Sequence, residues 1–585
     1  MNKFLKILPF IFLITAATIS AVGQTTYEER CDSVKAFFST FDIAPDYFIL
    51  TARFHEGVDL DTAVVTLDNL LSGQPRGDAY WMFSTMALYL HGAPNLPEQQ
   101  KKHIRELWST YQPLPGRSEH EHVLYYAALL LATENFHDMD ERGWFNGKST
   151  DLNHSEAETF LLDWFARTTE DGMEEFDSPT HTGFFLSAML LLRDFAADQG
   201  VRTRSEIMLD WLLAEFAAKY RDGMYTGPHS LEFEYSVIRP RASAMTCIGA
   251  LLFGDVELCY TGEQLLFAFS SYRPPDILRQ IALENVRPHT IVQRRRAGVR
   301  YRNTTAPKYV YETTFLTPWY AIGSLDGGLI QPVNQHSWDV SWKAPIDRST
   351  IFSLHPAASP ELLAEFYPAC EEEAWNTLAS LYGRYPTFNK YVGGSPYEEL
   401  FQYRNTLIAM YDIPKTDRHK LITTFFPHGL DATDADSTGP GWIFARSWRF
   451  LIGVFAVRPY QMVSEPAGTR FVSPFSRNGL IVQVASPPEV PTFEDFVERV
   501  KASKVDTSAF ARKKRIRYTT IFGDKLEFTY GGARKVNRKK TRFDPDYLVK
   551  SPVLTSKAGT GVLRVTFRKD TLILDMKNVR ITHKP

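Results

Sequence analysis

The sequence predicts a multidomain α+β protein, in which an N-terminal (α/α) toroid is followed by a C-terminal antiparallel β-sandwich (super-sandwich). Three observations lead to this prediction. The 585 residues exceed what one compact domain holds. Up to about residue 290, apolar residues recur at helical spacing in one segment after another. Beyond that point the chain becomes a series of short β-branched and aromatic runs separated by turns that contain glycine.

Residues 1–23 have the pattern of a cleavable signal peptide. Lys3 and Lys6 form a basic start, residues 7–22 are an uncharged apolar run, and Ala21 and Gly23 are the small residues that a signal peptidase reads. Nothing later in the chain is apolar for long enough to span a bilayer. The sequence therefore predicts a periplasmic or secreted chain that does not insert into a membrane after removal of the signal.

Residues 24–300 are expected to form the toroid, which would be the catalytic domain. Helical patterns cover residues 79–90, 121–133, 155–167, 184–197, 205–219, 242–252 and 275–284. The links between them are rich in Gly, Pro, Asn and Asp, as in residues 92–95 and 146–148. Successive helical hairpins without intervening strands are typical of a toroid or a solenoid. The lack of a strict sequence repeat favours the toroid.

Residues 301–585 are expected to form the antiparallel β-sandwich domain. Strand-like runs cover residues 301–311, 315–322, 337–342, 350–354, 421–426, 450–457, 479–485, 517–522, 525–530, 561–567 and 571–575. Turn signals such as Gly327-Gly328 and Gly531-Gly532 separate them. Two basic runs, 512–517 and 534–542, lie in this half. They fit a solvated sheet face, with a ligand patch as the alternative.

Composition limits the classes of partner and cofactor. The net charge of −3 gives the whole chain no attraction to nucleic acid. The 14% of aromatic residues would suit a saccharide-binding cleft, where rings stack on sugars, or an aromatic-rich core. No motif for a metal or an organic cofactor is present, and a structural divalent cation has no support in the sequence. Cys247 and Cys259 either pair in an oxidising compartment or stay as free buried thiols.

Four segments carry a resemblance to a known group of enzymes. They are EHVLYY (121–126), EEFDSPTH (174–181), NQHSWDVSW (334–342) and FQYRNTLIAMYD (401–412). In this order they resemble segments of the heparinase II/III, chondroitin AC lyase and alginate lyase type of polysaccharide lyase, which includes heparinase-like bacterial proteins of unassigned activity. The chain has Glu121 where that group usually has Asn, and His181 where it usually has Tyr.

The resemblance implies an enzyme that cleaves a uronate-containing, anionic polysaccharide by β-elimination. Such chemistry needs a group that neutralises the uronate carboxylate, a base for the C5 proton and an acid for the departing O4. In the resembled lyases a Tyr and a His share these tasks. We therefore expect Tyr235 to act as base and acid, with His229 as its partner. His122 and His181, each at the start of a predicted helix, are further catalytic candidates.

Two other functions stay open at this level. Glu175 and Asp177 lie on one turn, and Glu121 would lie near them in a closed toroid, so these carboxylates would suit a glycoside hydrolase. Asp177-Ser178-Pro179 is also typical of a simple helix-entry turn. The third function is that of a glycan-binding protein that keeps the scaffold without the chemistry.

Substrate contacts are expected from both halves of the chain. Arg239 and Arg241 follow Tyr235 closely. In the resembled fold, one edge of the β-sheet leans over the cleft, which makes His336 and Trp338 candidates. Arg404 with Asn405 lies in an apolar segment, where the arginine would bind a substrate carboxylate or pair with an internal acid.

A run of arginines lies at the predicted domain junction. It comprises Arg294, Arg295 and Arg296, with Arg300 and Arg302 just beyond. Guanidinium groups bind carboxylate and sulfate in bidentate fashion, so the run would fit an anionic glycan. A solvated linker between the domains is the alternative.

Overall fold

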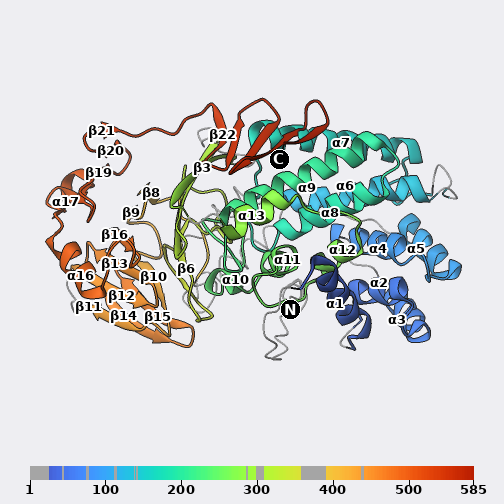
Figure 1. Ribbon diagram of the computed structural model, residues 1–585, viewed down its shortest axis with the longest axis horizontal. Helices are drawn as coiled ribbons and strands as arrows, with labels where there is room; N and C mark the ends of the chain where they lie inside the picture. The colour runs from blue at the N-terminus through green and yellow to red at the C-terminus, as the bar shows by residue number, and fades with distance from the viewer. Residues whose placement is uncertain are drawn as a thin grey trace.

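The computed structural model describes residues 25–42, 45–73, 78–110, 115–116, 118–136, 139, 143–284, 287–297, 309–356, 391–435 and 440–584. The predicted signal peptide lies outside these residues, as do Arg300 and Arg302. Helices form the N-terminal part of the chain and antiparallel sheets the C-terminal part (Figure 1), as the sequence predicts. Within the described part of the chain, no helix combines the length and the apolar character needed to cross a bilayer.

A closed ring of helices forms the centre of the N-terminal domain. Its members are α2 (Tyr47–Glu56), α4 (Ala79–His91), α6 (Glu119–Asn135), α8 (Thr182–Phe195) and α12 (Gly262–Phe269). Each packs against the next, and α12 packs against α2, so the circuit closes. The outer helices are α3 (Leu60–Ser72), α5 (Glu98–Thr110), α7 (Thr150–Asp171) and α9 (Gln199–Lys219). The arrangement is an α/α toroid.

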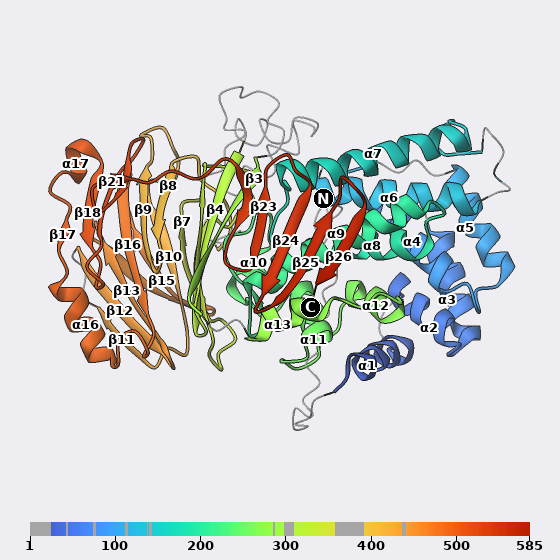
Figure 2. The ribbon, with the colours of Figure 1, turned by 45° about the horizontal axis from the view of Figure 1, so that its top comes forward.

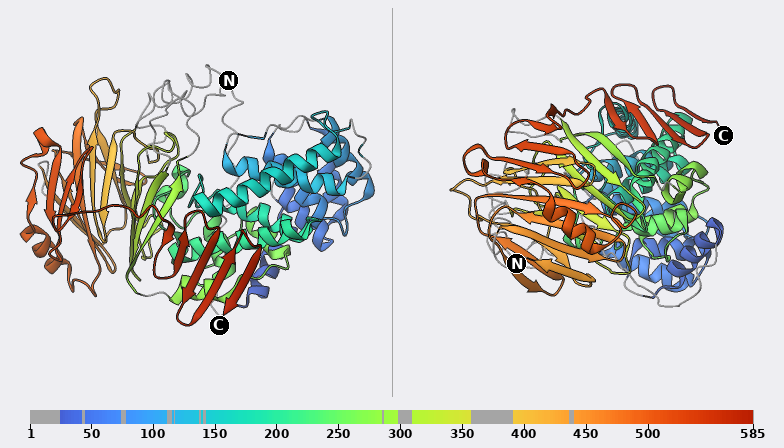
Figure 3. Two further views of the ribbon diagram at one scale, coloured as in Figure 1. Left: turned by 90° about the horizontal axis from the view of Figure 1, so that it is seen from above. Right: turned by 60° about the vertical axis from the view of Figure 1, so that its left-hand side comes forward.

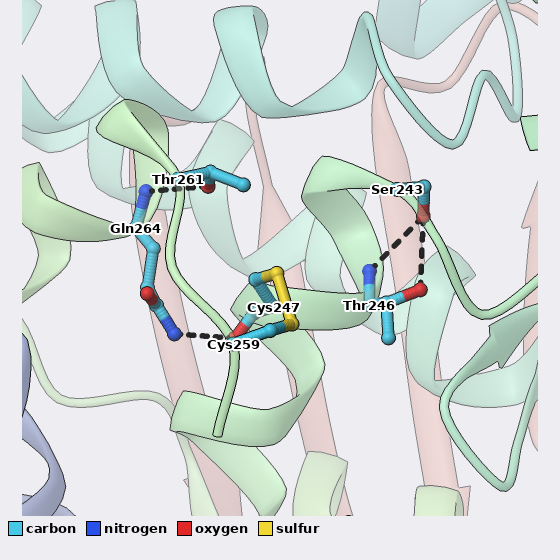
Figure 4. The surroundings of a disulfide bond; sticks show 6 residues. All are labelled: Ser243, Thr246, Cys247, Cys259, Thr261 and Gln264. Atoms are coloured by element: carbon cyan, nitrogen blue, oxygen red, sulfur yellow. Dashed lines mark hydrogen bonds between the residues drawn. A yellow bond between two sulfur atoms is a disulfide. The ribbon is translucent and has the colours of Figure 1, made fainter. Parts of the chain in front are cut away.

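Four further helices and one small hairpin complete this domain. They are α1 (Tyr27–Thr40), α10 (Glu234–Ile238), α11 (Ala244–Phe253), α13 (Asp276–Glu284), β1 (Tyr220–Arg221) and β2 (Met224–Tyr225). Cys247 of α11 and Cys259 are joined by a disulfide (Figure 4), which decides between the two states left open by the sequence. The side-chain amide of Gln264 donates to the Cys247 carbonyl, 2.7 Å away, and so ties α12 to the bridge.

Local sequence explains where the inner helices begin. Asp46, Asp78, Ser118 and Thr261 each accept a hydrogen bond from the first turn of α2, α4, α6 and α12, which satisfies free backbone N–H groups. Helix α8 differs, because its first flanking residue, His181, makes no such cap. The start of α8 is instead held by contacts described below for the candidate site.

The helical domain ends earlier than the predicted boundary at residue 300. Helix α13 ends at Glu284, and strand β3 (His289–Arg296) begins the first sheet. The difference arises because residues 294–296 are neither a linker nor a glycan-facing run: they are buried in β3, and all three arginines pair with carboxylates of the helical domain. Charge in this segment marks an internal interface.

In the described part of the C-terminal domain, the strands form three antiparallel sheets. The largest has 13 strands in the order β14 (Gln461–Glu465), β15 (Gly468–Ser473), β10 (Ile422–Pro427), β7 (Thr350–Leu354), β6 (Trp338–Trp342), β5 (Tyr320–Asp326), β4 (Tyr309–Leu316), β3, β22 (Tyr547–Lys550), β23 (Leu554–Lys557), β24 (Val562–Phe567), β25 (Asp570–Asp575) and β26 (Arg580–Lys584). Its last strands leave the sandwich and lie over helices of the toroid (Figures 2 and 3), where β23–β26 contact α9 and α13.

The other two sheets stack outward from the first. The second sheet has the order β11 (Ala432–Ala435), β12 (Gly441–Ser447), β13 (Phe450–Ala456), β16 (Arg477–Ala485), β9 (Thr406–Asp412) and β8 (Glu398–Tyr403). The third comprises β17 (Val505–Asp506), β18 (Arg515–Thr519), β19 (Lys525–Thr529), β20 (Arg534–Val536) and β21 (Lys539–Lys540), with α16 (Phe493–Ala502) and α17 (Phe510–Lys513) beside it. One apolar core lies between the first and second sheets, and another between the second and third.

Candidate active site

The turn formed by residues 174–181 connects α7 to α8 and is bonded to the start of α6. The backbone N–H groups of Glu119 and His120 donate to the Glu175 carboxylate, at 2.8 and 3.1 Å. In return, the N–H groups of Glu174 and Glu175 donate to the Glu119 carboxylate, both at 2.9 Å. Glu175 therefore occupies the N-terminus of α6, where free N–H groups and the helix dipole favour an anion.

Glu175 also orients a histidine that in turn contacts a tyrosine. Oε2 of Glu175 lies 2.5 Å from Nδ1 of His120, and Nε2 of His120 lies 2.6 Å from the hydroxyl of Tyr80. Burial raises the pKa of Glu175, but the nearby His120 ring outweighs it and holds that pKa below its ordinary value. Burial keeps the pKa of Tyr80 well above its usual range. A carboxylate, an imidazole and a hydroxyl in this order form a proton relay.

His181 adds a second histidine to this cluster. Its ring lies 4.5 Å from that of His120 between centroids, and its Nδ1 is 2.8 Å from the Ser178 hydroxyl. Burial is the main cause that lowers the pKa of His181 to about 3, and the proximity of His120 adds to it. His181 is therefore neutral at physiological pH. It lies within the cluster, beside the relay.

Glu232 joins the turn to the segment that carries His229 and Tyr235. Its buried carboxylate accepts hydrogen bonds from the Thr180 N–H at 2.9 Å, the Thr180 hydroxyl at 2.8 Å and the Ser178 hydroxyl at 3.1 Å. Ser230 adds two hydrogen bonds to the Phe176 carbonyl. The two turns, far apart in sequence, are thus fastened directly to each other.

Asp177 belongs to a buried ion network between the two domains. Its carboxylate pairs with Lys219 of α9 and with Arg295 of β3. Lys219 also pairs with Glu312 of β4, and Arg295 also pairs with Glu215 of α9. Burial alone would raise the pKa of Asp177, but Lys219 and Arg295 hold it well below its ordinary value. Burial and the charge of Asp177 raise the pKa of Glu312 to about 8. Asp177 is thus engaged with its own protein.

His229 and His336 meet across the domain interface. Each donates its backbone N–H to the carbonyl of the other at 2.9 Å, and their rings stack at 5.5 Å between centroids. Nδ1 of His229 lies 2.6 Å from the Asp177 carbonyl, which leaves Nε2 without the proton in the neutral ring. Burial lowers the pKa of His229 to about 4, and burial with the nearby His229 holds the pKa of His336 well below its ordinary value. The structure therefore joins these two predicted residues.

Tyr235 lies two residues beyond Phe233, whose ring is 5.2 Å from that of His181. It is 41% exposed, at the start of α10. Arg239 donates to its hydroxyl at 2.9 Å and also pairs with Asp347 at 2.9 Å. These two predicted residues therefore form one pair, of an exposed tyrosine and a half-buried arginine.

Two predicted residues at the start of α6 have structural partners. Glu121 forms the capping box of α6 with Ser118, so its carboxylate is not paired with Glu175 or Asp177. His122 directs Nδ1 to the Ser118 carbonyl at 2.7 Å, on the side of the helix where Phe160 lies. Since Glu121, Glu175 and Asp177 each have other partners, the structure offers no free carboxylate pair for the hydrolase interpretation among these three residues.

The remaining predicted contacts are distributed over both domains. Trp338 is fully buried in its core and Arg241 pairs with Asp222, so neither side chain is free for a ligand in this structure. Arg404 is exposed at the β8–β9 turn, with Asn405 buried behind it. Arg404 is six residues along the strand from Glu398, or about 20 Å in an extended strand. Since Glu398 lies by Ser337, the Arg404 end of β8 is remote from His336.

Sequence reasoning did not select Tyr80, His120, Glu119 or Glu232 for the site. His120 and His122 are two positions apart in the sequence, and only the phase of α6 decides which of them faces the inside of the toroid. Tyr80 follows the Asp78 cap of α4 by two residues, as His120 follows the Ser118 cap of α6. A ring of inner helices that begin on the same side would have suggested that such positions meet. Among the described residues, no group of three His, Cys, Asp or Glu side chains is placed to hold a metal ion.

The fold and the site define a protein with an α/α toroid, an antiparallel β-sandwich and a histidine-rich cluster at their junction. No protein-family model matches the chain, and no curated protein matches it. Among solved structures, it is similar to the Streptomyces coelicolor A3 chondroitin AC lyase in complex with chondroitin sulphate. The identity is 10%, over 96% of this chain and 90% of that chain, with a TM-score of 0.43. At this level the likeness does not assign the chain to a family.

Proposed function

We propose that the protein is a polysaccharide lyase that cleaves a uronate-containing glycan by β-elimination. The observation that carries the proposal is the Tyr80–His120–Glu175 relay, with 2.6 and 2.5 Å between successive polar atoms. An elimination of this kind needs a base and an acid at one place, and a phenol coupled to an oriented imidazole supplies both. The exported, soluble chain predicted from residues 1–23 suits an extracellular polymer as substrate.

The relay moves one proton from C5 of the uronate to O4 of the leaving sugar. His120, held by Glu175, takes the phenolic proton of Tyr80, and the resulting phenolate removes the C5 proton. The electron pair forms the C4–C5 double bond as the C4–O4 bond breaks, and the Tyr80 hydroxyl protonates O4. His120 then returns its proton to Tyr80. The raised pKa of Tyr80 keeps the phenol protonated at rest, so that the phenolate forms only when His120 takes its proton.

Tyr235 and His229 are the alternative pair for proton transfer in the same reaction. Tyr235 is exposed and bonded to Arg239, whose guanidinium would also suit a uronate carboxylate. His229 has Nε2 as its acceptor nitrogen, and His336 stacks on it. We place Tyr235, His229, Arg239 and His336 in substrate binding and give proton transfer to Tyr80.

A matched pair of variants tests the assignment. Tyr80→Phe and Tyr235→Phe each remove one hydroxyl, and elimination is followed by the ultraviolet absorbance of the unsaturated uronate on a panel of anionic polysaccharides. Tyr80→Phe should lower kcat by about 10²-fold or more, the usual effect of losing a general acid–base group. Tyr235→Phe should chiefly raise KM. The reverse pattern would move the chemistry to Tyr235.

The same assay separates lyase activity from the other two functions. New reducing ends without ultraviolet absorbance would identify a hydrolase. Retention of the glycan in a native gel without either product would identify a binding protein. In both cases the elimination proposal fails.

A further inference from the structure

Residues 501–550 differ sharply in charge from the rest of the chain. They contain 15 Lys and Arg and five Asp and Glu, a net charge of +10, whereas the whole chain carries −3. These residues include the whole third sheet, β17–β21, and the segment that follows it. The protein therefore gathers positive charge on one small unit of an otherwise acidic molecule, and such a concentration attracts polyanions.

The charge is greatest at the β20–β21 hairpin. Arg538, Lys539, Lys540 and Arg542 are all exposed and, among the described residues, form no ion pair. By contrast, Lys535 is paired with Glu527 at 2.7 Å. The hairpin thus presents four cations to solvent that the fold itself does not use.

Two local features disfavour these cations unless a ligand offsets them. Lys535 and Lys540 lie directly opposite each other across β20 and β21, and like charges in such positions are destabilising. Arg538 has a φ of 71° in the two-residue turn, a conformation that usually selects glycine. The hairpin therefore keeps charge at positions where stability alone would favour other residues.

Two acids of this sheet, Asp506 and Glu527, are committed to its own cations, whereas Asp524 in the β18–β19 turn accepts a hydrogen bond from Asn537 beside Arg538. A cross-strand row runs through Asp506, Arg517, Glu527, Lys535 and Lys540. Arg517 bonds Glu527 at 2.6 Å and lies 3.6 Å from Asp506. The acids neutralise the middle of the row and leave Lys540, at its hairpin end, as a free cation.

The basic unit is connected to the side of the sandwich that carries His336. Arg534 of β20 pairs at 2.7 Å with Asp326, the last residue of β5. The preceding Leu325 donates its N–H to the Ser337 carbonyl at 2.9 Å, and Ser337 follows His336. The chain from Lys540 to β22 also runs toward the domain junction (Figure 1), where β22 pairs with β3. A long polyanion on the hairpin would extend toward the candidate site.

We infer that the β17–β21 sheet, through Arg538, Lys539, Lys540 and Arg542, is a second, non-catalytic binding surface for an anionic glycan. Spaced, solvated point charges on a short hairpin suit the repeated carboxylate or sulfate groups of such a polymer. The surface would hold the chain while the toroid site acts on it. It goes beyond the proposed elimination, because binding here requires no turnover.

Charge reversal with a matched control tests this surface. One variant carries Arg538→Glu, Lys539→Glu and Lys540→Glu. The control carries Lys569→Glu, Lys577→Glu and Arg580→Glu, three exposed cations on the far strands of the first sheet. Both sets change the net charge equally. Both are made in the Tyr80→Phe protein, so that cleavage does not consume the probe, and circular dichroism verifies folding.

Dissociation constants are measured with labelled chondroitin sulfate and alginate at two salt concentrations, with dextran as a neutral glycan. We expect the hairpin variant to weaken binding about tenfold or more, the control to change it little, and salt to weaken binding by the parent Tyr80→Phe protein strongly. Equal loss in both variants, or binding that ignores salt, would overturn the inference. So would binding of single-stranded DNA or phosphatidylserine vesicles without binding of the anionic glycans. The outcome of this binding test does not depend on whether the protein shows elimination in the activity assay.

Discussion

Nδ1 of His120 lies 2.5 Å from Oε2 of Glu175, and this contact ties the start of α6 to the turn before α8. The same carboxylate accepts two backbone N–H groups of α6, so its position is fixed by the helix and not by the histidine alone. An imidazole held in this way has one defined tautomer and one defined direction. Its other nitrogen is directed to Tyr80.

Glu175→Gln should reduce activity far more than it reduces stability. The two backbone N–H groups donate to different oxygens of Glu175, so the amide keeps an acceptor for one of them, and it loses the charge that stabilises a protonated His120. We expect kcat to fall about 10²-fold, with KM within a few-fold of wild type, in the elimination assay.

Glu121→Gln is the matched control, because it changes the same group at the same helix end. Its carboxylate serves the capping box, so this variant should lose about 1 kcal/mol of stability or less and keep its activity. Equal loss of kcat in both variants would show that the start of α6, and not the His120 contact, is what matters.

His91 provides a test of acid sensitivity away from the site. Burial lowers its pKa to about 3, and its neighbour His55 adds to the shift. Because the unfolded chain has the ordinary pKa of about 6.5, it binds more protons than the folded chain between about pH 6.5 and 3. The contribution of His91 to stability is therefore present above pH 6.5 and is lost as the pH falls through this window.

His91→Leu should remove this loss. Relative to wild type, the variant should gain about 2 kcal/mol more in the free energy of unfolding at pH 5 than at pH 7. Urea unfolding at the two pH values measures the difference. If the free energies of unfolding of the variant and the wild type differ by the same amount at both pH values, His91 is not held neutral by burial.

The order of elements was predictable, because periodicity and turn residues are local properties of the sequence. The helical and β-rich halves follow from them, and so does the position of Glu175 and His181 on the turn before α8. Side-chain partners were not predictable, since they depend on which helix faces meet. Residues 294–296 show this most clearly: three arginines that suggest solvent or ligand lie in a buried strand, because the toroid supplies their carboxylates. His120 and His122 both lie at the start of α6, and only the phase of the helix turns His120 toward Glu175.

Lys219→Met should be among the most destabilising single substitutions. Its side chain is buried and pairs with both Asp177 and Glu312, so its loss would leave Arg295 as the one cation beside these two buried carboxyl groups among the described residues. Breaking a buried pair in this way typically costs about 3–5 kcal/mol. The double variant with Glu312→Gln should recover part of the loss. Urea unfolding of both variants checks this, and a double variant no better than the single one would contradict the network.

The disulfide should contribute measurably although its loop is short. Cys247 and Cys259 are separated by 12 positions, for which the chain-entropy model gives about 3 kcal/mol. Cys247→Ala with Cys259→Ala should lower the unfolding free energy by that order, and a reductant should lower the Tm of wild type but not of the double variant. Cys31→Ala, which removes the buried free thiol, should keep the response to reductant. If reductant does not change the Tm of the wild type, the disulfide is absent or does not contribute to stability.

Gly323 tests whether the toroid and the sandwich must dock tightly for function. A Cβ at this position would lie 2.5 Å from Cα of Gly227, a backbone atom that cannot move aside cheaply. Gly227 precedes the Pro228-His229 segment that packs on the sheet, so Gly323→Ala should displace His229 from His336. We expect lower activity and a loss of about 1–3 kcal/mol, as for overpacking elsewhere. Gly73→Ala is the control, since its Cβ would meet only an ordinary contact at 3.5 Å. Unchanged activity in Gly323→Ala, measured together with Tm, would mean that turnover does not depend on the contact between His229 and His336.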